Sequence, residues 1–380
     1  MPHRVLMGLL FFPRGGSAHV ARNLARRLPS AGWDVRVVSG SGPPPGDARA
    51  FYDGVDVVPV DMTAALDAPD PLLADPPLHP SYEERDDAPD KVFAALDDRH
   101  YAHQVDAWCR ILRGAGAAEA DVLHLHHLTP LNEAAARVAP DVPVVGHLHG
   151  TELLMLEEGE GRWPHAAAWA RRMRGWAQRC ERLIVLSASQ VGRVEELLGV
   201  DPDRCVRIPN GFDPDVFDAH PVDRAAFWHR QLGEAFTAEQ PVLLYVGRFT
   251  AVKRLPVLIE AYARARAHFD RRAPLVLLGG YPGEWEGEHP LEAIRRTGAE
   301  DVFLAGWHGH DELPDFLAAS EAVVLPSVRE QFGQVLVEAM ACGLPPIAVD
   351  RFGPAEIVTD GDCGWLVEPD DEEALAGALA

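Results

Sequence analysis

Lysine is almost absent from this 380-residue sequence. It occurs only at positions 91 and 253, so nearly all of the 35 lysine and arginine residues are arginine. Basic residues are also outnumbered by 58 acidic ones, which gives a formal net charge of −23. This excess argues against nucleic acid and anionic membranes as bulk partners, but it allows a local basic pocket for an anionic ligand. Lys253 is therefore a residue to follow.

Cysteine and long apolar runs are scarce as well. The five cysteines follow no metal-binding or disulfide-framework spacing, which indicates a reduced, cytoplasmic protein. No apolar run reaches the roughly 18 residues that a membrane span needs. The apolar start at residues 4–12 is short and leads into a glycine turn, so we expect a buried strand and not a signal peptide.

Strand-like and helix-like segments alternate along both halves of the chain, which predicts α/β folds with parallel sheets. Apolar runs that are followed by helical patterns lie at 4–12, 121–127, 142–150, 182–189 and 241–249. A chain of this length suggests two domains. A polar stretch near 215–238 separates the halves, so we predict one domain over 1–217 and another over 218–380.

Two glutamates, Glu330 and Glu338, stand eight positions apart around a predicted helix at 333–342. Free backbone N–H groups at a helix start favour an anion. Eight helical residues span at most roughly 12 Å, about the distance between the two sugars of a nucleotide diphosphate sugar. The spacing suggests a diphosphate over the helix start and one glutamate on each sugar. The alternative is that Glu338 is a solvated helix residue and Glu330 an acidic residue in a loop. Spacing alone does not decide between the two interpretations.

Two cations follow a predicted buried strand in the second half. Arg248 and Lys253 lie at its carboxyl end, where open α/β sheets bind ligands. Arginine clamps a phosphate through two hydrogen bonds, and lysine acts as a point charge, so the pair suits a diphosphate leaving group. For an arbitrary arginine and lysine at this spacing, a surface ion pair is the alternative.

The segment EQFGQVLVEAMACGLPPIAV (330–349) closely resembles the signature of glycosyltransferase family four, the retaining GT-B enzymes with an E-x7-E motif. Further segments resemble family features in the expected order: PRGGSAHVARNLARRL (13–28), IPNGFD (208–213), VGRFTAVKR (246–254), GWHGHDELPDFLAAS (306–320) and RFGPAEIVTDGDCGWLV (351–367). The resemblance is strong over 180–368 and fair over 1–40 and 121–152. It is absent over 41–120, a loop-rich segment that could carry acceptor specificity.

This resemblance implies an α/β GT-B fold, in which two Rossmann-like domains with parallel sheets face across a cleft. It implies a retaining hexosyltransferase whose second domain binds the nucleotide diphosphate sugar, UDP- or GDP-linked, and whose first domain binds the acceptor. A small-molecule acceptor, as in natural-product biosynthesis, fits the acidic chain; a cell-envelope glycolipid or polysaccharide is the alternative. No cofactor is implied. Relatives continue with a helix that crosses back onto the first domain, and this helix is expected to be missing here.

The resemblance also assigns roles to individual residues. The predicted catalytic residues are Arg248, Lys253, Glu330 and His149. Glu330 would position the donor sugar, and Glu338 would hold the ribose hydroxyls. The predicted substrate-binding residues are Gly15, Gly16, Trp307, His308, Phe332, Gly333, Gln334, Val335 and Glu338.

No metal is expected at the site. His124 and His126 alternate on one strand, as do His147 and His149 on the next. Without a carboxylate or cysteine to complete a ligand set, packing is the preferred interpretation of these pairs. Each Asp-x-Asp pair, at 201–203, 213–215 and 360–362, lies in a turn and is not expected to hold a metal.

Three other interpretations stay open. A GT-B epimerase of nucleotide sugars would share the donor site and lack an acceptor, and a non-catalytic nucleotide-sugar-binding protein would turn nothing over. A phosphorylase would require pyridoxal phosphate.

The basic, tryptophan-bearing segment 165–183 could dock on a membrane surface, but an ordinary helix that covers the sheet is preferred.

Overall fold

The computed structural model describes residues 2–82, 89–159, 161–233, 236–237, 240–280 and 285–380. It divides the chain into two compact units, Met1–Pro209 and Asn210–Ala380. The predicted boundary after residue 217 falls inside the second unit, because Phe217 is buried in the core of that unit. Among the described residues, no helix is both long and apolar enough to cross a membrane.

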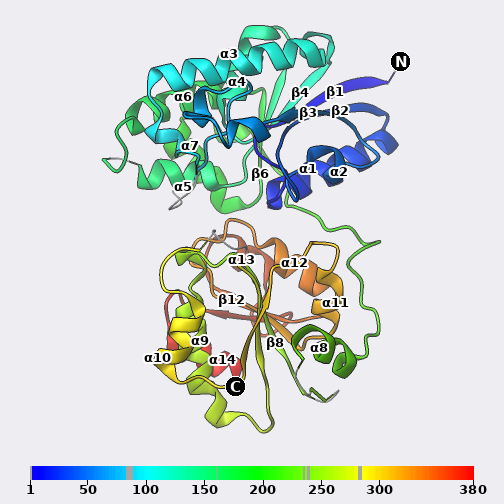
Figure 1. Ribbon diagram of the computed structural model, residues 1–380, viewed down its shortest axis with the longest axis vertical. Helices are drawn as coiled ribbons and strands as arrows, with labels where there is room; N and C mark the ends of the chain where they lie inside the picture. Colours follow the sequence, from blue (N-terminus) through cyan, green and yellow to red (C-terminus); the bar gives the residue numbers. More distant parts are fainter. Residues whose placement is uncertain (1, 83–88, 160, 234–235, 238–239, 281–284) are drawn as a thin grey trace. The chain divides into compact units, whose positions relative to one another are not determined.

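The first unit contains a seven-stranded sheet in the order β3-β2-β1-β4-β5-β6-β7 (Figure 1). All paired strands are parallel. Its strands are β1 (His3–Leu9), β2 (Trp33–Ser41), β3 (Asp56–Asp61), β4 (Val122–His126), β5 (Val144–His147), β6 (Arg182–Val185) and β7 (Cys205–Arg207). Its helices are α1 (Gly16–Arg27), α2 (Ala48–Phe51), α3 (Asp98–Ala115), α4 (Pro130–Val138), α5 (Thr151–Glu158), α6 (Ala166–Arg179) and α7 (Ala188–Leu198).

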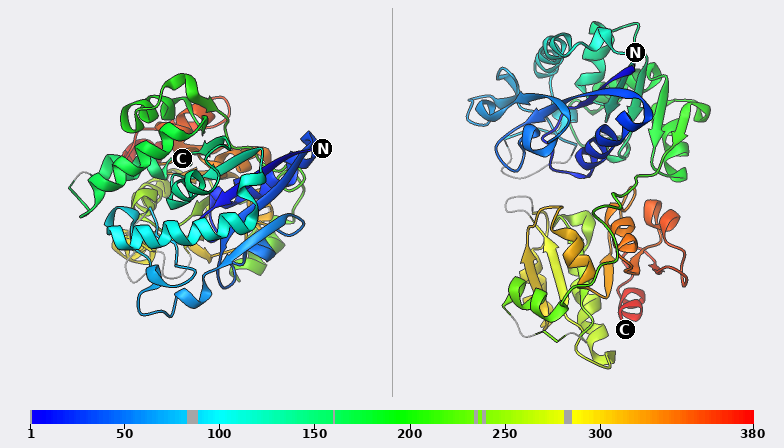
Figure 2. Two further views of the ribbon diagram at one scale, coloured as in Figure 1. Left: turned by 90° about the horizontal axis from the view of Figure 1, so that it is seen from above. Right: turned by 90° about the vertical axis from the view of Figure 1, so that its right-hand side faces the viewer.

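Helices cover both faces of this sheet. Helices α1 and α2 bury small side chains against one face, among them Ala21, Ala25 and Ala48, and Tyr52 at the end of α2 joins them. Helix α3 lies along the outside of the unit, where both ribbon views show it clearly, and buries Trp108 on the other face (Figures 1 and 2). Helix α6 buries its tryptophans, Trp169 and Trp176, in the same core, so it covers the sheet as the preferred interpretation of 165–183 expects.

The second unit repeats the plan with a six-stranded parallel sheet in the order β10-β9-β8-β11-β12-β13. Its strands are β8 (Leu243–Gly247), β9 (Leu275–Gly279), β10 (Val302–Gly306), β11 (Ala322–Leu325), β12 (Pro346–Val349) and β13 (Trp365–Val367). Its helices are α8 (Arg224–Leu232), α9 (Leu255–Ala265), α10 (Pro290–Thr297), α11 (Leu313–Ala318), α12 (Gln334–Ala341), α13 (Phe352–Ile357) and α14 (Glu372–Leu379).

Two apolar layers sandwich this second sheet. Helices α8, α11 and α12 pack on one side, and α9, α10 and α14 pack on the other (Figure 1). The apolar strands bury side chains on both faces, as parallel strands between helical layers require. The prediction of two Rossmann-like α/β domains with parallel sheets is confirmed.

Both sheets change their winding direction at one point. In the second unit the chain runs outward from β8 to β10 and then returns to the other side of β8 as β11. In the first unit the same reversal lies between β1 and β4. The loops that leave such neighbouring strands at their carboxyl ends diverge, and ligands of open α/β sheets bind in the resulting crevice.

Candidate active site

The loops after β8 and β11 bring two of the predicted donor-site residues, Lys253 and Glu330, together. Lys253 ends a short 3-10 turn, Ala251–Lys253, and its Nζ donates to Oε2 of Glu330 at 2.5 Å. Each of the two side chains is only 18% exposed. The backbone N–H of Val328 also donates to the carbonyl of Val252, at 3.1 Å, so the two loops are joined. Two residues that lie 77 positions apart thus form one charged pair.

The environment of Glu330 keeps its carboxylate ionised. Burial by itself raises the pKa of this group, but the charge and hydrogen bond of Lys253, the Gly333 N–H and the charge of Arg248 together lower it by more. The net result is a lowered pKa. The buried Tyr245 hydroxyl holds the strand end by donating to the carbonyl of Arg248 at 2.7 Å. The loop after β8 thus carries the positive charge of Lys253, and the loop after β11 carries the negative charge of Glu330.

Helix α12 begins at Gln334, with Gly333 as its cap, one residue from the predicted start. Gly333 has a φ of 99°, in the left-handed region that favours glycine. Phe332 is buried beside it, and Val335 packs partly against the second core. The helix consequently starts at a rigid point, with its first N–H groups directed toward the loop end of the sheet.

Glu338 is not a solvated helix residue, because its side chain is only 5% exposed. Its Oε1 accepts from Gln334 Nε2 at 3.2 Å and lies 2.9 Å from Nε2 of His310. The alternative raised for this glutamate from spacing alone is therefore wrong. Sequence reasoning missed His310, although it lies in the segment 306–320 that carries the family resemblance.

The predicted base-recognition residues occupy the turn after β10. Trp307 is 48% exposed, whereas His308 is anchored between the Ala305 carbonyl at 3.2 Å and Glu312 at 3.2 Å. The His308 ring also contacts Phe316. Trp307 is thus about half exposed, and His308 shapes the turn.

In the first unit, Gly15 and Gly16 follow β1, as predicted; Gly15 caps α1 and Gly16 is its first residue. Gly15 is extended, with φ −104° and ψ 178°, a conformation open to any residue. A Cβ atom added to either glycine would meet nothing within 4 Å. The fold of the first unit therefore gives no steric reason for glycine at these positions, which is compatible with a ligand approaching the backbone.

His149 follows β5 and is held by its neighbours. Its Nε2 lies 3.0 Å from Nδ1 of His126, and its backbone N–H donates to Glu152 at 3.2 Å. Glu152 is completely buried and also lies 2.6 Å from Nδ1 of His127. Burial, and then the neighbouring histidines, lower the pKa of His149 well below 6.5, so the ring is neutral near pH 7. Sequence reasoning missed Glu152, whose role depends on contacts between β4, β5 and α5.

Substituting Glu152 by alanine should destabilise the first unit. It leaves the His127 ring and the His149 N–H without their acceptor, and each orphaned buried donor costs about 1–3 kcal/mol. Urea denaturation should show the loss, and Glu196→Ala, at an exposed position of α7, is the control. If both variants unfold at the wild-type urea concentration, Glu152 does not hold this loop.

The Asp-x-Asp pairs act as turn caps. Asp201, Asp213 and Asp360 each accept a backbone N–H, from Asp203, Asp215 and Leu366 respectively, at 2.9–3.1 Å. Their carboxylates are thus engaged in local structure, as acidic side chains in turns commonly are.

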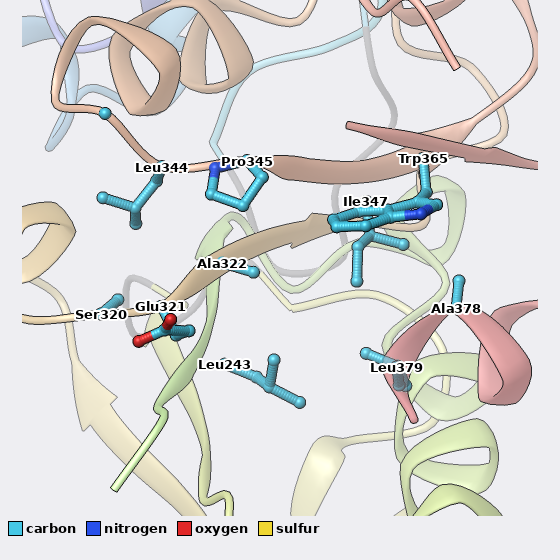
Figure 3. Close-up of a pocket in the computed structure, with 11 residues that line it drawn as sticks. Leu243, Ser320, Glu321, Ala322, Leu344, Pro345, Ile347, Trp365, Ala378 and Leu379 are labelled. Atoms are coloured by element: carbon cyan, nitrogen blue, oxygen red, sulfur yellow. The ribbon is translucent and has the colours of Figure 1, made fainter. Parts of the chain in front are cut away.

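A separate hollow of about 370 Å³ lies at the opposite end of the second sheet (Figure 3). It is bordered by the first residues of β8, β11 and β13, namely Leu243, Ala322 and Trp365, and by Ala378 and Leu379 of α14. Its one charged side chain is Glu321, so nothing in its lining matches an anionic ligand. We place the candidate donor site at the loop end of the sheet instead.

Comparison with known proteins identifies the family. Residues 14–216 match the family model described as Glycosyltransferase Family 4, and residues 230–380 match the one described as Glycosyl transferases group 1. The chain is 32% identical over 293 residues to a D-inositol 3-phosphate glycosyltransferase of Stackebrandtia nassauensis, covering 71% of this chain and 63% of the relative. It is 27% identical over 267 residues to the N-acetyl-alpha-D-glucosaminyl L-malate synthase of Bacillus anthracis, covering 67% and 63%.

Solved structures share the whole fold. Anabaena HepE in complex with UDP and glucose is similar with a TM-score of 0.69 at 19% identity, covering 99% of this chain and 88% of that one. The sucrose-phosphate synthase of Thermosynechococcus elongatus is similar with a TM-score of 0.70 at 20% identity, covering 99% and 89%. The chain spans about 63% of the length of the two curated relatives above. With both family models matched and the GT-B fold in place, the chain belongs to glycosyltransferase family four.

Proposed function

We propose that this chain transfers a sugar, with retention at the anomeric carbon, from a nucleotide diphosphate sugar to a small polar acceptor. The observation that carries the proposal is the charged pair Lys253–Glu330 at the switch point of the second sheet, beside the start of α12. Cations and free N–H groups at one point suit a diphosphate, and a carboxylate beside them suits sugar hydroxyls.

The proposed chemistry is stabilisation of the leaving group. As the bond to the donor sugar breaks, negative charge develops on the nucleoside diphosphate. Arg248, Lys253 and the N–H groups at the start of α12 would neutralise that charge, and donors that are oriented before the reaction lower its barrier. In the free protein, Glu330 already holds the Lys253 ammonium in place.

Glu338 would hold the ribose hydroxyls. Its Oε1 is engaged by His310 and Gln334, and a carboxylate has two oxygens that together accept several hydrogen bonds. His149, Gly15 and Gly16 are assigned to the transferred sugar, and Trp307 to the base. These assignments rest on the family resemblance together with the exposure and geometry of each residue.

Replacing Glu338 by glutamine should weaken donor binding more than it slows transfer. Hydrogen bonds to a charged group contribute about 1.5–3 kcal/mol, so we expect the KM for the donor to rise about 10- to 100-fold while kcat changes little. Initial rates over a range of donor concentrations measure both constants. A fall in kcat at an unchanged KM would contradict the ribose assignment.

The names of the relatives suggest where to begin the search for substrates. Both relatives act on small acceptors that carry a negative charge, an inositol phosphate and malate. We would incubate the protein with UDP-glucose or UDP-N-acetylglucosamine and either acceptor, and follow UDP release and product mass. A product whose anomeric configuration matches that of the donor supports the proposal, and inversion would contradict it. If the donor sugar were converted to its epimer in the absence of an acceptor, the result would favour an epimerase.

A further inference from the structure

Four histidines lie on one face of the first sheet, at the ends of β4 and β5. His126 pairs with His147 in the register of the two parallel strands, and His124 lies two positions before His126 on the same face. His149 follows at the end of β5. His149 is assigned above to the sugar; the other three have no role in the proposed transfer reaction.

The three remaining rings converge at a spacing that suits a metal ion. His124, His126 and His147 each offer one nitrogen, and these nitrogens lie within 4.8 Å of one another. Nε2 of His124 and Nδ1 of His147 are 3.2 Å apart. Two ligands of a tetrahedral zinc ion, with Zn–N bonds of about 2.0–2.1 Å, are separated by about 3.3 Å. The geometry thus comes close to that of a metal site, with small ring movements needed to bring in His126.

Two nitrogens of this cluster are buried without a partner. Within the part of the chain that the structure describes, Nε2 of His126 and Nε2 of His147 accept or donate no hydrogen bond. The two residues are 0% and 3% exposed. Nearly all buried polar side-chain atoms in proteins have a partner, so Nε2 of His126 is available to a ligand. His147 meets His124 through its other ring nitrogen, Nδ1.

The charge state of the cluster also suits a metal. Burial lowers the pKa of His124 to about 4 and the pKa values of His126 and His147 well below 6.5. The rings are therefore neutral near pH 7, and only neutral imidazole has the lone pair that coordinates a metal. The sequence alone favoured packing, because no carboxylate or cysteine completes the set. In the structure, a third histidine from the adjacent strand lies beside the first two.

We propose that His124, His126 and His147 bind one transition-metal ion of the zinc class in the first unit. Imidazole nitrogens select zinc, nickel, copper or cobalt, whereas magnesium and calcium require oxygen ligands. Three protein ligands leave the fourth tetrahedral position to water. Coordination replaces the His124–His147 hydrogen bond, and its proton moves to the other nitrogen of the same ring, so no proton is lost. This site is separate from the donor site of the second unit.

The test is a calorimetric titration of the EDTA-treated, dialysed protein with zinc chloride. We expect one equivalent to bind tightly, and magnesium chloride to give no binding at this site. His124→Gln and His126→Gln should each weaken that binding by about 10- to 100-fold or more. The control is His268→Gln, at an exposed histidine of the second unit, which should bind zinc as the wild type does.

A second measurement needs no variant and so does not depend on how well the variants fold. Cobalt added to the wild-type protein should give the intense visible absorption of a tetrahedral, nitrogen-ligated ion, and one equivalent of zinc should abolish it. The weak spectrum of an octahedral, oxygen-ligated ion would overturn the proposal. Equal zinc binding by the wild type and both cluster variants would do the same, and would leave the histidines as a hydrogen-bonded stack. Nucleotide binding in EDTA tests the donor site independently.

Discussion

Lys253→Ala should lower the rate of sugar transfer by about 100- to 1,000-fold, the range lost when one preoriented stabiliser of a developing negative charge is removed. The ammonium is held against Glu330, with both side chains 18% exposed. This partial burial makes its field stronger than that of a surface charge. The loss should be mainly in kcat, because the charge on the leaving group grows as the bond breaks.

The chain supplies its own control for this prediction. Lys91, the other lysine, is exposed and lies in the first unit, so Lys91→Ala should transfer sugar at the wild-type rate. If the two alanine variants were equally active, Lys253 would have no role in leaving-group stabilisation.

A double variant separates catalysis from stability. Lys253→Ala leaves Glu330 as an uncompensated, mostly buried charge, which is destabilising. Adding Glu330→Gln removes that charge, so the double variant should regain thermal stability without regaining activity. For the wild type, the lowered pKa of Glu330 means that the pair stabilises the fold above the ordinary glutamate pKa near 4.5. This contribution is lost as the pH falls through the lower, folded-state value.

Gly353→Ala should cost the second unit about 1–3 kcal/mol or more, the usual range for overpacking. A Cβ atom at this position would lie 2.3 Å from the carbonyl oxygen of Phe332 and 2.4 Å from its Cα, and backbone atoms cannot rotate away. The Gly353 N–H also donates to the Glu330 carbonyl at 3.3 Å. The substitution should therefore displace the segment that starts α12, and with it the proposed diphosphate site.

Two measurements check this result. In a unit of this size, each kcal/mol lowers the midpoint of thermal unfolding by about 2–4 °C, and the affinity for the donor nucleotide should fall as well. Gly377→Ala is the control, because a Cβ atom in that exposed part of α14 meets nothing within 4 Å. That change should leave nucleotide binding intact and should slightly stabilise the helix. Unchanged stability and nucleotide affinity in Gly353→Ala would mean that this close contact does not hold the site.

The local sequence pattern predicted the two sheets and the start of α12. The start of α12 depends on residues next to it in sequence, namely a glycine with positive φ and an apolar helical run, so its predicted position was within one residue. The alternation of strands and helices predicted both sheets for the same reason. The family resemblance, carried by short motifs, marked Lys253 and Glu330 before their contact could be known.

Contacts between distant segments explain what sequence reasoning missed. Glu152 is buried because β4, β5 and α5 meet around it, and His310 reaches Glu338 across 28 positions. The predicted end of the first domain differs from the observed end of the first unit for a similar reason. Phe217, the last residue of the predicted first domain, packs into the core of the second unit. None of these contacts can be recognised from the residues that lie next to them in the sequence.

The most direct test of the donor-site assignment is calorimetric titration of the wild type and Lys253→Ala with UDP, GDP, ADP and dTDP in the presence of EDTA. We predict that the wild type binds one of these nucleotides selectively and without a metal, and that Lys253→Ala binds the same nucleotide much more weakly. If the wild type bound none of the four, or if the two proteins bound them equally well, the second unit would not hold its donor at the Lys253–Glu330 pair.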